Sequence, residues 1–99
     1  MIYHVTTNAE WETAQQSGLY EAASLSIEGF IHLSQEHQLK GVLERYYQGK
    51  SNLVMLHVQE DLLTVPLKFE LSPSIGEEFP HVYGAINLDA VVKVTSIES

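Results

Sequence analysis

The chain has 99 residues, of which 44% are hydrophobic and 18% are charged, and it contains no cysteine. This composition predicts a single globular domain over residues 1–99, without disulfides, a thiol nucleophile or a cysteine-based metal site. Thirteen acidic residues against five basic ones give a formal charge of −8, which disfavours binding to nucleic acid or to an anionic membrane. No apolar run approaches the roughly 18 residues of a membrane span, and the first residues lack a signal-peptide pattern, so we expect a cytoplasmic protein.

Alternation, helical spacing and turn residues predict the order of the secondary-structure elements. Thr7 and Glu10 fit a capping box at the start of the first helix, and Gly18 fits its end. The expected segments are a strand at 2–6, a helix at 8–17, an extended arm or short strand at 19–23, a connector at 24–27, a central strand at 28–34, a helix at 35–48, strands at 53–58 and 65–71, a polar loop at 72–78, an ordered apolar connector at 79–84 and a strand at 90–97. These elements predict an α+β fold of five or six strands, mostly antiparallel, with two helices.

The central strand is the segment around which the candidate chemistry is arranged. Alternation places Ile31 and Leu33 toward the core, and His32 and Ser34 on the opposite face. Gly29 predicts a bulge or the close approach of a ligand at the start of this strand. Ser34 is also expected to cap the helix that follows, in which apolar residues recur at helical spacing and indicate packing against a sheet. These apolar residues are Leu39, Val42, Leu43, Tyr46 and Tyr47.

Three histidines, His4, His32 and His81, lie in apolar segments that can meet at one pocket. Converging imidazoles could ligate a divalent metal, although no metal-binding spacing pre-organises them. A histidine beside a carboxylate can instead exchange protons near neutral pH. Glu28 and Glu70 flank apolar strands, so either could supply that carboxylate. We expect Glu77 and Glu78 to belong to a solvated loop, His37 to face solvent and His57 to be a satisfied core residue. Ser34 lacks a G-x-S-x-G turn, so helix capping explains it better than nucleophilic catalysis. Tyr3 and Tyr83 offer flat faces for a planar ligand ring.

The combination of these motifs resembles a known family. The matching pieces are Ile2-Tyr3-His4, Trp11, Gly18-Leu19-Tyr20, Ser24-Leu25, Glu28-Gly29-Phe30-Ile31-His32-Leu33-Ser34 and Phe79-Pro80-His81-Val82-Tyr83-Gly84. Together they resemble the small bacterial family catalogued as domain of unknown function 952, which is placed with the ADP-ribosyltransferase-like fold of packed, split antiparallel β-sheets.

That resemblance implies roles for individual residues. It implies that His4 bonds a ribose hydroxyl and that His32 packs near a nicotinamide or phosphate. The third-motif glutamate of active transferases is replaced here by Ile86, which argues against ADP-ribosyl transfer. The arginines of the RNA phosphotransferase relatives are also missing, because the single Arg45 lies on a predicted helix.

The leading hypothesis is a domain that binds a nucleotide in a histidine-lined cleft, with or without transferase-like chemistry. NAD or ADP-ribose is the candidate ligand, and NAD the candidate cofactor. The predicted cleft residues are His4, His32, Ser34, His81 and Tyr83, and the predicted acid–base residues are His32, His81 and Glu70. The alternatives are nucleotide binding without turnover, a divalent-metal site made by the three histidines, and a structural or interaction module without enzymatic activity.

Overall fold

The computed structural model describes residues 1–97, which form an α+β structure with three separate antiparallel sheets. The strands are β1 (Ile2–Thr7), β2 (Leu19–Tyr20), β3 (Ile31–His32), β4 (Leu53–Val58), β5 (Leu67–Ser72), β6 (Glu77–Val82), β7 (Ile86–Asn87) and β8 (Val91–Ile97). The α-helices are α1 (Asn8–Ser17), α2 (Ala23–Glu28) and α3 (Leu39–Tyr46), and the 3-10 turns are η1 (Glu36–Gln38), η2 (Glu60–Leu62) and η3 (Leu88–Ala90). Within residues 1–97 no helix is long and apolar enough to cross a membrane.

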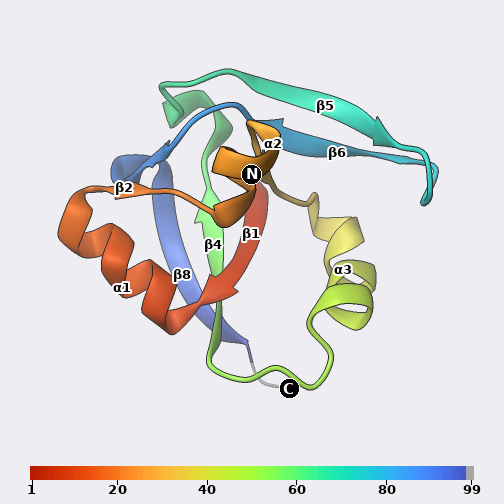
Figure 1. Cartoon of the computed structure of the whole chain (residues 1–99), viewed down its shortest axis with the longest axis horizontal. Coiled ribbons are helices and arrows are strands. Elements are labelled where there is room, and N and C mark those ends of the chain that lie inside the picture. The colour runs from red at the N-terminus through yellow and green to blue at the C-terminus, as the bar shows by residue number, and fades with distance from the viewer. Residues whose placement is uncertain (98–99) are drawn as a thin grey trace.

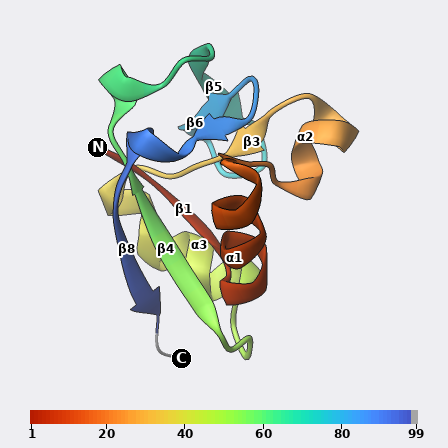
Figure 2. The same ribbon diagram turned by 90° about the vertical axis from the view of Figure 1, so that its left-hand side faces the viewer.

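Two three-stranded sheets, ordered β1-β4-β8 and β3-β6-β5, are accompanied by the short pair β2-β7. The α1 and α3 helices lie on opposite sides of the β1-β4-β8 sheet, and the β5–β6 hairpin lies across one end of it (Figures 1 and 2). The two larger sheets meet at Tyr3 and Ser34, whose backbones exchange hydrogen bonds of 2.8 and 2.7 Å. This junction positions the candidate site.

The start and the end of α1 confirm the sequence prediction. The Thr7 hydroxyl accepts a hydrogen bond from the Glu10 backbone N–H at 3.1 Å, and Gly18 ends the helix in the left-handed conformation with φ of 91°. The second half of the predicted capping box is wrong. The Glu10 carboxylate accepts a hydrogen bond from the Thr6 hydroxyl at 3.1 Å instead of reaching back to the backbone of the cap.

The core lies where one face of the β1-β4-β8 sheet meets α1, β2 and the inner face of β3 and β6. Ile31 and Leu33 are buried, as the alternation of the central strand predicts. The apolar run of β4 is also buried at four of its six positions, which fits its place in the middle of a sheet. The buried residues of this core are Ile2, Ala14, Tyr20, Ile31, Leu33, Val54, Leu56, Val58, Val82, Ile86 and Ala90.

The segment before the central strand is a helix, not the predicted connector. Gly29 ends α2 with φ of 88°, and its N–H donates to the Leu25 oxygen at 3.0 Å. A Cβ at Gly29 would meet nothing within 4 Å, so the predicted bulge or close approach is wrong. The strand itself is reduced to Ile31 and His32, because the residues before it belong to the helix end.

Residues 79–82 lie in a strand rather than in the predicted connector. β6 pairs with β5 from Leu67↔Val82 to Ser72↔Glu77, and with β3 on its other side. Pro80 has no N–H to donate to a neighbouring strand. Its carbonyl is nevertheless used, accepting from the Leu33 N–H at 2.9 Å. With β6 and β7, residues 1–97 contain eight strands instead of five or six, and α2 makes three α-helices instead of two.

The predicted helix over residues 35–48 consists of η1 followed by α3. Gln35, and not Ser34, caps this segment, in a reciprocal capping box with Gln38. No residue of α3 is fully buried. Val42 and Tyr46 line the cleft described below rather than a closed core, so the apolar stripe marks the wall of a cavity.

Candidate functional site

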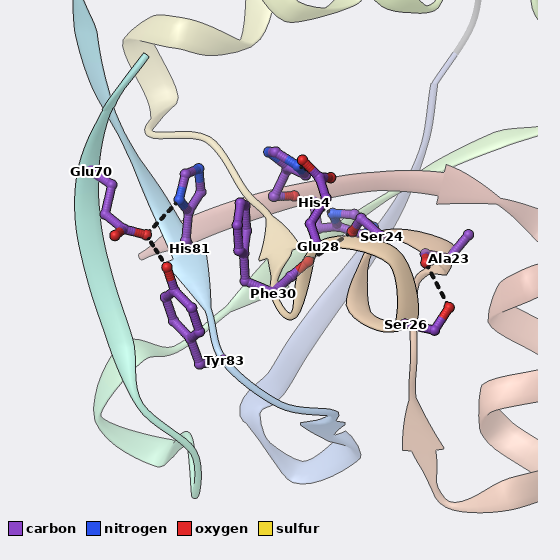
Figure 3. A network of polar contacts seen from close by, with 10 residues as sticks. His4, Ala23, Ser24, Ser26, Glu28, Phe30, Glu70, His81 and Tyr83 are labelled. Atoms are coloured by element: carbon purple, nitrogen blue, oxygen red, sulfur yellow. Dashed lines mark hydrogen bonds and ion pairs between the residues drawn. The ribbon is translucent and has the colours of Figure 1, made fainter. Parts of the chain in front are cut away.

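A cleft of about 720 Å³ lies at the junction of the two larger sheets, with walls from β1, β3, β6 and α3. The structure brings four of the predicted residues to this cleft, namely His4, His32, Ser34 and His81. Aromatic side chains form much of the remaining lining, and they include Tyr3, Tyr46, Tyr47 and Phe79. Tyr83 and Glu70 do not line the cleft, since they lie behind His81 (Figure 3).

His32 and His81 form a pair at the edge of the cleft. They are directly opposite each other in the β3–β6 ladder, with ring centroids 5.1 Å apart and ring planes at 77°. The Phe30 ring stacks on His81 at 4.2 Å and 21° (Figure 3). The centroid of the same ring lies 4.8 Å from that of His32. One aromatic side chain therefore lies against both imidazoles.

A carboxylate binds one nitrogen of each imidazole in this pair. Glu28 Oε2 lies 2.8 Å from His32 Nε2, and Glu70 Oε1 lies 2.8 Å from His81 Nδ1. Within residues 1–97, the other nitrogen of each ring, Nδ1 of His32 and Nε2 of His81, has no hydrogen-bond partner. The His81 side chain is 12% exposed and that of His32 is 51% exposed, so His81 is the more firmly placed of the two.

Tyr83 completes a triad with Glu70 and His81. Its hydroxyl donates a short hydrogen bond to the same Glu70 oxygen that binds His81 (Figure 3). The Tyr83 and His81 hydrogen bonds lower the pKa of Glu70, and the bond to Glu70 raises the pKa of Tyr83. Glu70 therefore remains a carboxylate that accepts a hydrogen bond from His81.

His4 is buried behind this pair, and both of its nitrogens are occupied. Nδ1 lies 2.6 Å from the main-chain oxygen of His32, and Nε2 lies 2.7 Å from the Tyr20 hydroxyl. Because a carbonyl only accepts, Nδ1 carries a proton. Burial lowers the pKa of His4 to about 4, although the bond to His32 and the charge of Glu10 act in the opposite direction. His4 is therefore a neutral imidazole at pH 7.

A chain of hydrogen bonds continues from His4 to a wall of the cleft. The Tyr20 hydroxyl lies 3.0 Å from Thr6 Oγ1, which lies 3.1 Å from Glu10 Oε2. Sequence reasoning missed Thr6, Glu10 and Tyr20 as members of the site, although all three line the cleft. Two signals were available, since alternation places His4 and Thr6 on one strand face and Glu10 follows in the first turn of the next helix.

The three histidines converge on the cleft without forming a metal site. In the described part of the chain, no group of three or more His, Cys, Asp or Glu side chains could hold a metal ion. Both His4 nitrogens are already bonded, which explains why His4 cannot act as the third ligand. Ser34 is buried beside the cleft, and its hydroxyl makes no hydrogen bond within residues 1–97.

The remaining predicted polar residues lie outside the cleft. His37 is exposed, as predicted, while His57 is only half-buried and bonds Thr95 Oγ1 at 3.0 Å. Desolvation lowers the pKa of His57. Glu77 and Glu78 are exposed as predicted, but they lie at the start of β6 and not in a loop.

The chain belongs to the family described as "Protein of unknown function (DUF952)", whose profile matches residues 5–94. It is similar to the crystal structure of protein CC0527 from Caulobacter crescentus, with a TM-score of 0.89 and 34% identity over 98% of this chain and 85% of that one. A double mutant of CC0527 gives the same TM-score at 33% identity over the same shares of both chains, and its solution NMR structure gives 0.84 at 34% over 98% of this chain and 84% of that one. No curated protein matches this chain.

Proposed function

We propose that the protein binds a nucleotide, such as NAD, ADP-ribose or a related molecule, in the cleft, with His32 and His81 as its acid–base pair. One observation carries this proposal: the two imidazoles line one cleft, each with one nitrogen bound by a carboxylate and one nitrogen free. The cleft volume of about 720 Å³ lies within the range of small-molecule sites, roughly 300–1,000 Å³.

The architecture also supports an ADP-ribosyltransferase-like fold as part of the proposal. Split antiparallel sheets with a ligand between them are the arrangement that the sequence resemblance implies. Here the cleft takes its lining from both larger sheets, with His4 from β1 and His81 from β6. The aromatic side chains of the lining offer faces for a base or nicotinamide ring.

The two imidazoles are arranged to work as a base and an acid. With Glu70 accepting the Nδ1 proton of His81, the Nε2 lone pair is available to take a proton from a ligand. The reversed arrangement holds for His32, in which Glu28 binds Nε2 and leaves Nδ1 available. One ring can therefore remove a proton while the other, when protonated, donates one. Ser34 lies beside them with a hydroxyl free to bond a ribose oxygen.

The geometry supports roles for His4 and Ile86 that differ from those implied by the family resemblance. His4 uses both nitrogens within the protein, so we propose that it holds the β3 backbone and does not bind ribose directly. Ile86 is fully buried in β7 and pairs with Tyr20, so it provides no carboxylate to the cleft. The proposal therefore concerns nucleotide binding with histidine acid–base groups, not transfer assisted by a third-motif glutamate.

A thermal-shift measurement tests this function. A ligand at ten times its Kd stabilises the native state by about 1.4 kcal/mol, which raises the Tm of a domain of this size by about 5 to 10 °C. We expect such a rise with NAD or ADP-ribose, and its loss in His32→Ala and His81→Ala. His57→Ala is the matched control, because it removes a histidine outside the cleft and should keep the response.

Two outcomes of the thermal-shift measurement would contradict the proposal. No Tm change with NAD, ADP-ribose, AMP or adenosine at millimolar concentration would exclude the nucleotide proposal and leave a structural or interaction module. A rise that persists in both cleft variants would show that the ligand binds elsewhere.

A further inference from the structure

The hydrogen-bonded chain from the His32 carbonyl to Glu10 consists of four contacts. His4 Nδ1 to His32 O measures 2.6 Å, and His4 Nε2 to the Tyr20 hydroxyl measures 2.7 Å. Tyr20 to Thr6 measures 3.0 Å, and Thr6 to Glu10 measures 3.1 Å. Each contact needs one hydrogen between its two heavy atoms to be attractive.

A count of hydrogens shows that the chain is one short. Tyr20 and Thr6 supply one hydrogen each, and a neutral His4 supplies one, at Nδ1. An ionised Glu10 supplies none. Three hydrogens therefore serve four contacts, and one contact, such as Tyr20 O to Thr6 Oγ1, brings two lone pairs together. An uncompensated polar contact of this kind, next to a buried imidazole, is destabilising.

One additional proton completes the chain, and it can be added at either end. If His4 takes it, Nδ1 still donates to the His32 oxygen and every other donor points toward Glu10, but a charged imidazole is then buried. If Glu10 takes it, the carboxyl donates to Thr6, Thr6 donates to Tyr20, and Tyr20 donates to His4 Nε2. The second arrangement keeps His4 neutral and places the added proton at an exposed side chain. The low pKa of His4, about 4, supports it.

We infer that Glu10 is a second proton-accepting group of the cleft, distinct from the histidine pair, and that proton uptake there completes the chain to His4. The step forms one O–H bond at Glu10 Oε2 and breaks one O–H bond of the proton donor. The donor is an acidic hydroxyl of a bound ligand, which is left as an oxyanion, or a hydronium ion, which is left as water. No covalent bond within the chain breaks, because the Thr6 hydroxyl only rotates from Glu10 to Tyr20. This inference does not depend on the nature of the ligand.

Other titratable groups near this chain are engaged elsewhere. The Tyr47 hydroxyl donates to the Val5 oxygen at 3.3 Å, and burial raises its pKa. Lys50 lies with Nζ 5.5 Å from the Tyr47 ring centroid and forms no ion pair with Glu10 in the part of the chain that the structure describes. On the β3 and β6 side, the His32 and His81 side chains bond Glu28 and Glu70.

The substitution Glu10→Gln tests the inference directly. An amide NH₂ in the place of the carboxylate donates to Thr6 and supplies the missing hydrogen permanently. We expect the Tm at pH 7 to equal or exceed that of the wild type, and His4 to remain neutral to a lower pH in ¹⁵N NMR of its ring. Glu12→Gln, an exposed position on α1, is the control for the change in charge. Glu10 is the acidic residue of the first turn of α1, so loss of its charge is by itself destabilising. A Tm of Glu10→Gln below that of the wild type at pH 7 would therefore overturn the inference.

A second variant tests whether His4 and Glu10, at the two ends of the hydrogen-bonded chain, are connected. In the wild type, proton uptake at Glu10 turns the Thr6 hydroxyl toward Tyr20 and leaves His4 neutral. The Glu10 carboxyl ¹³C signal should therefore shift on acidification with the same midpoint as a small hydrogen-bond shift of the His4 Nε2 ¹⁵N signal, well short of the change that ring protonation produces. In Tyr20→Phe, which keeps the buried ring and removes the hydroxyl, the two signals should separate. Thr6→Val breaks the chain at another point and serves if the first variant does not fold. Separate midpoints in the wild type, or a common midpoint that survives the break, would contradict the inference.

Discussion

The Nδ1 atom of His4 lies 2.6 Å from the main-chain oxygen of His32, so a buried imidazole on β1 is bonded to the strand that carries a cleft imidazole on β3. The two sheets also meet at Tyr3 and Ser34, one residue along β1 and two residues beyond His32. The relative position of the cleft walls therefore depends on a few polar contacts at one junction. The His4 contact is the one made by a side chain, so it can be removed by substitution.

Replacement of His4 by alanine should destabilise the protein strongly. It removes a buried ring and leaves the His32 carbonyl and the Tyr20 hydroxyl without their partner. Buried groups left in this way cost about 1–3 kcal/mol each, so for the two groups we expect a loss of about 2–6 kcal/mol in the free energy of unfolding. Urea denaturation measures it, with the exposed His37→Ala as a control that should stay within about 0.5 kcal/mol. A cost for His4→Ala as small as that of the control would refute the role of this junction.

Stability should fall as the pH is lowered from 6.5 toward 4. Burial lowers the pKa of His4 from 6.5 to about 4, so the unfolded chain takes up this proton before the native protein does. The contribution of neutral His4 is complete above pH 6.5 and amounts to about 3 kcal/mol, which is lost across that interval. The lowered pKa of Glu70 acts in the same direction at more acidic pH. Unfolding free energies measured at several pH values should show a flatter profile in His4→Ala, and an equally steep one would be inconsistent with this assignment.

Tyr83→Phe should raise the pKa of Glu70. The Tyr83 hydrogen bond is the largest cause of the lowered value, while the bond to His81 remains in the variant. Carboxyl ¹³C NMR titration measures the change. Tyr46→Phe provides a control, since this exposed tyrosine lies on α3, away from Glu70. An unchanged Glu70 titration would mean that Tyr83 does not stabilise the carboxylate in solution.

Gly84→Ala should destabilise the protein because of one neighbour. A Cβ at this position would lie 2.7 Å from Val65 Cγ1, closer than side-chain carbon atoms approach each other. We expect a cost of about 1–3 kcal/mol from this overpacking. In a Val65→Ala background the same substitution should cost clearly less, which a double-mutant cycle measures. Additive costs would show that the loss does not come from this contact.

The elements that the sequence predicted well are those in which local pattern and tertiary packing agree. The Thr7 cap and the Gly18 end of α1, and the buried run of β4, need no information from distant residues. β6 contains Pro80, which is a local signal against a strand, and the pairing of the Pro80 carbonyl with the Leu33 N–H depends on a segment far away in the sequence. α2 was missed because no side chain caps its first turn.

The site was predictable where it depends on a local pattern. Alternation placed His32 and Ser34 on one strand face, and the cleft contains both. The pairing of His81 with Glu70 depends on the β5–β6 register, and the chain from His4 to Glu10 depends on contacts among β1, β2 and α1. No local pattern carries that information. The position of Tyr83 behind His81 could not be foreseen either, because it required knowing that residues 79–82 form a strand.

The most direct test of the central proposal is imidazole NMR of the wild-type protein during titration with ADP-ribose and with NAD. If the cleft binds the nucleotide beside the acid–base pair, the ring signals of His32 and His81 should shift in a saturable way, while those of His37 and His57 should stay in place. Saturation without movement of the His32 and His81 signals, or movement confined to His37 or His57, would contradict the proposed site.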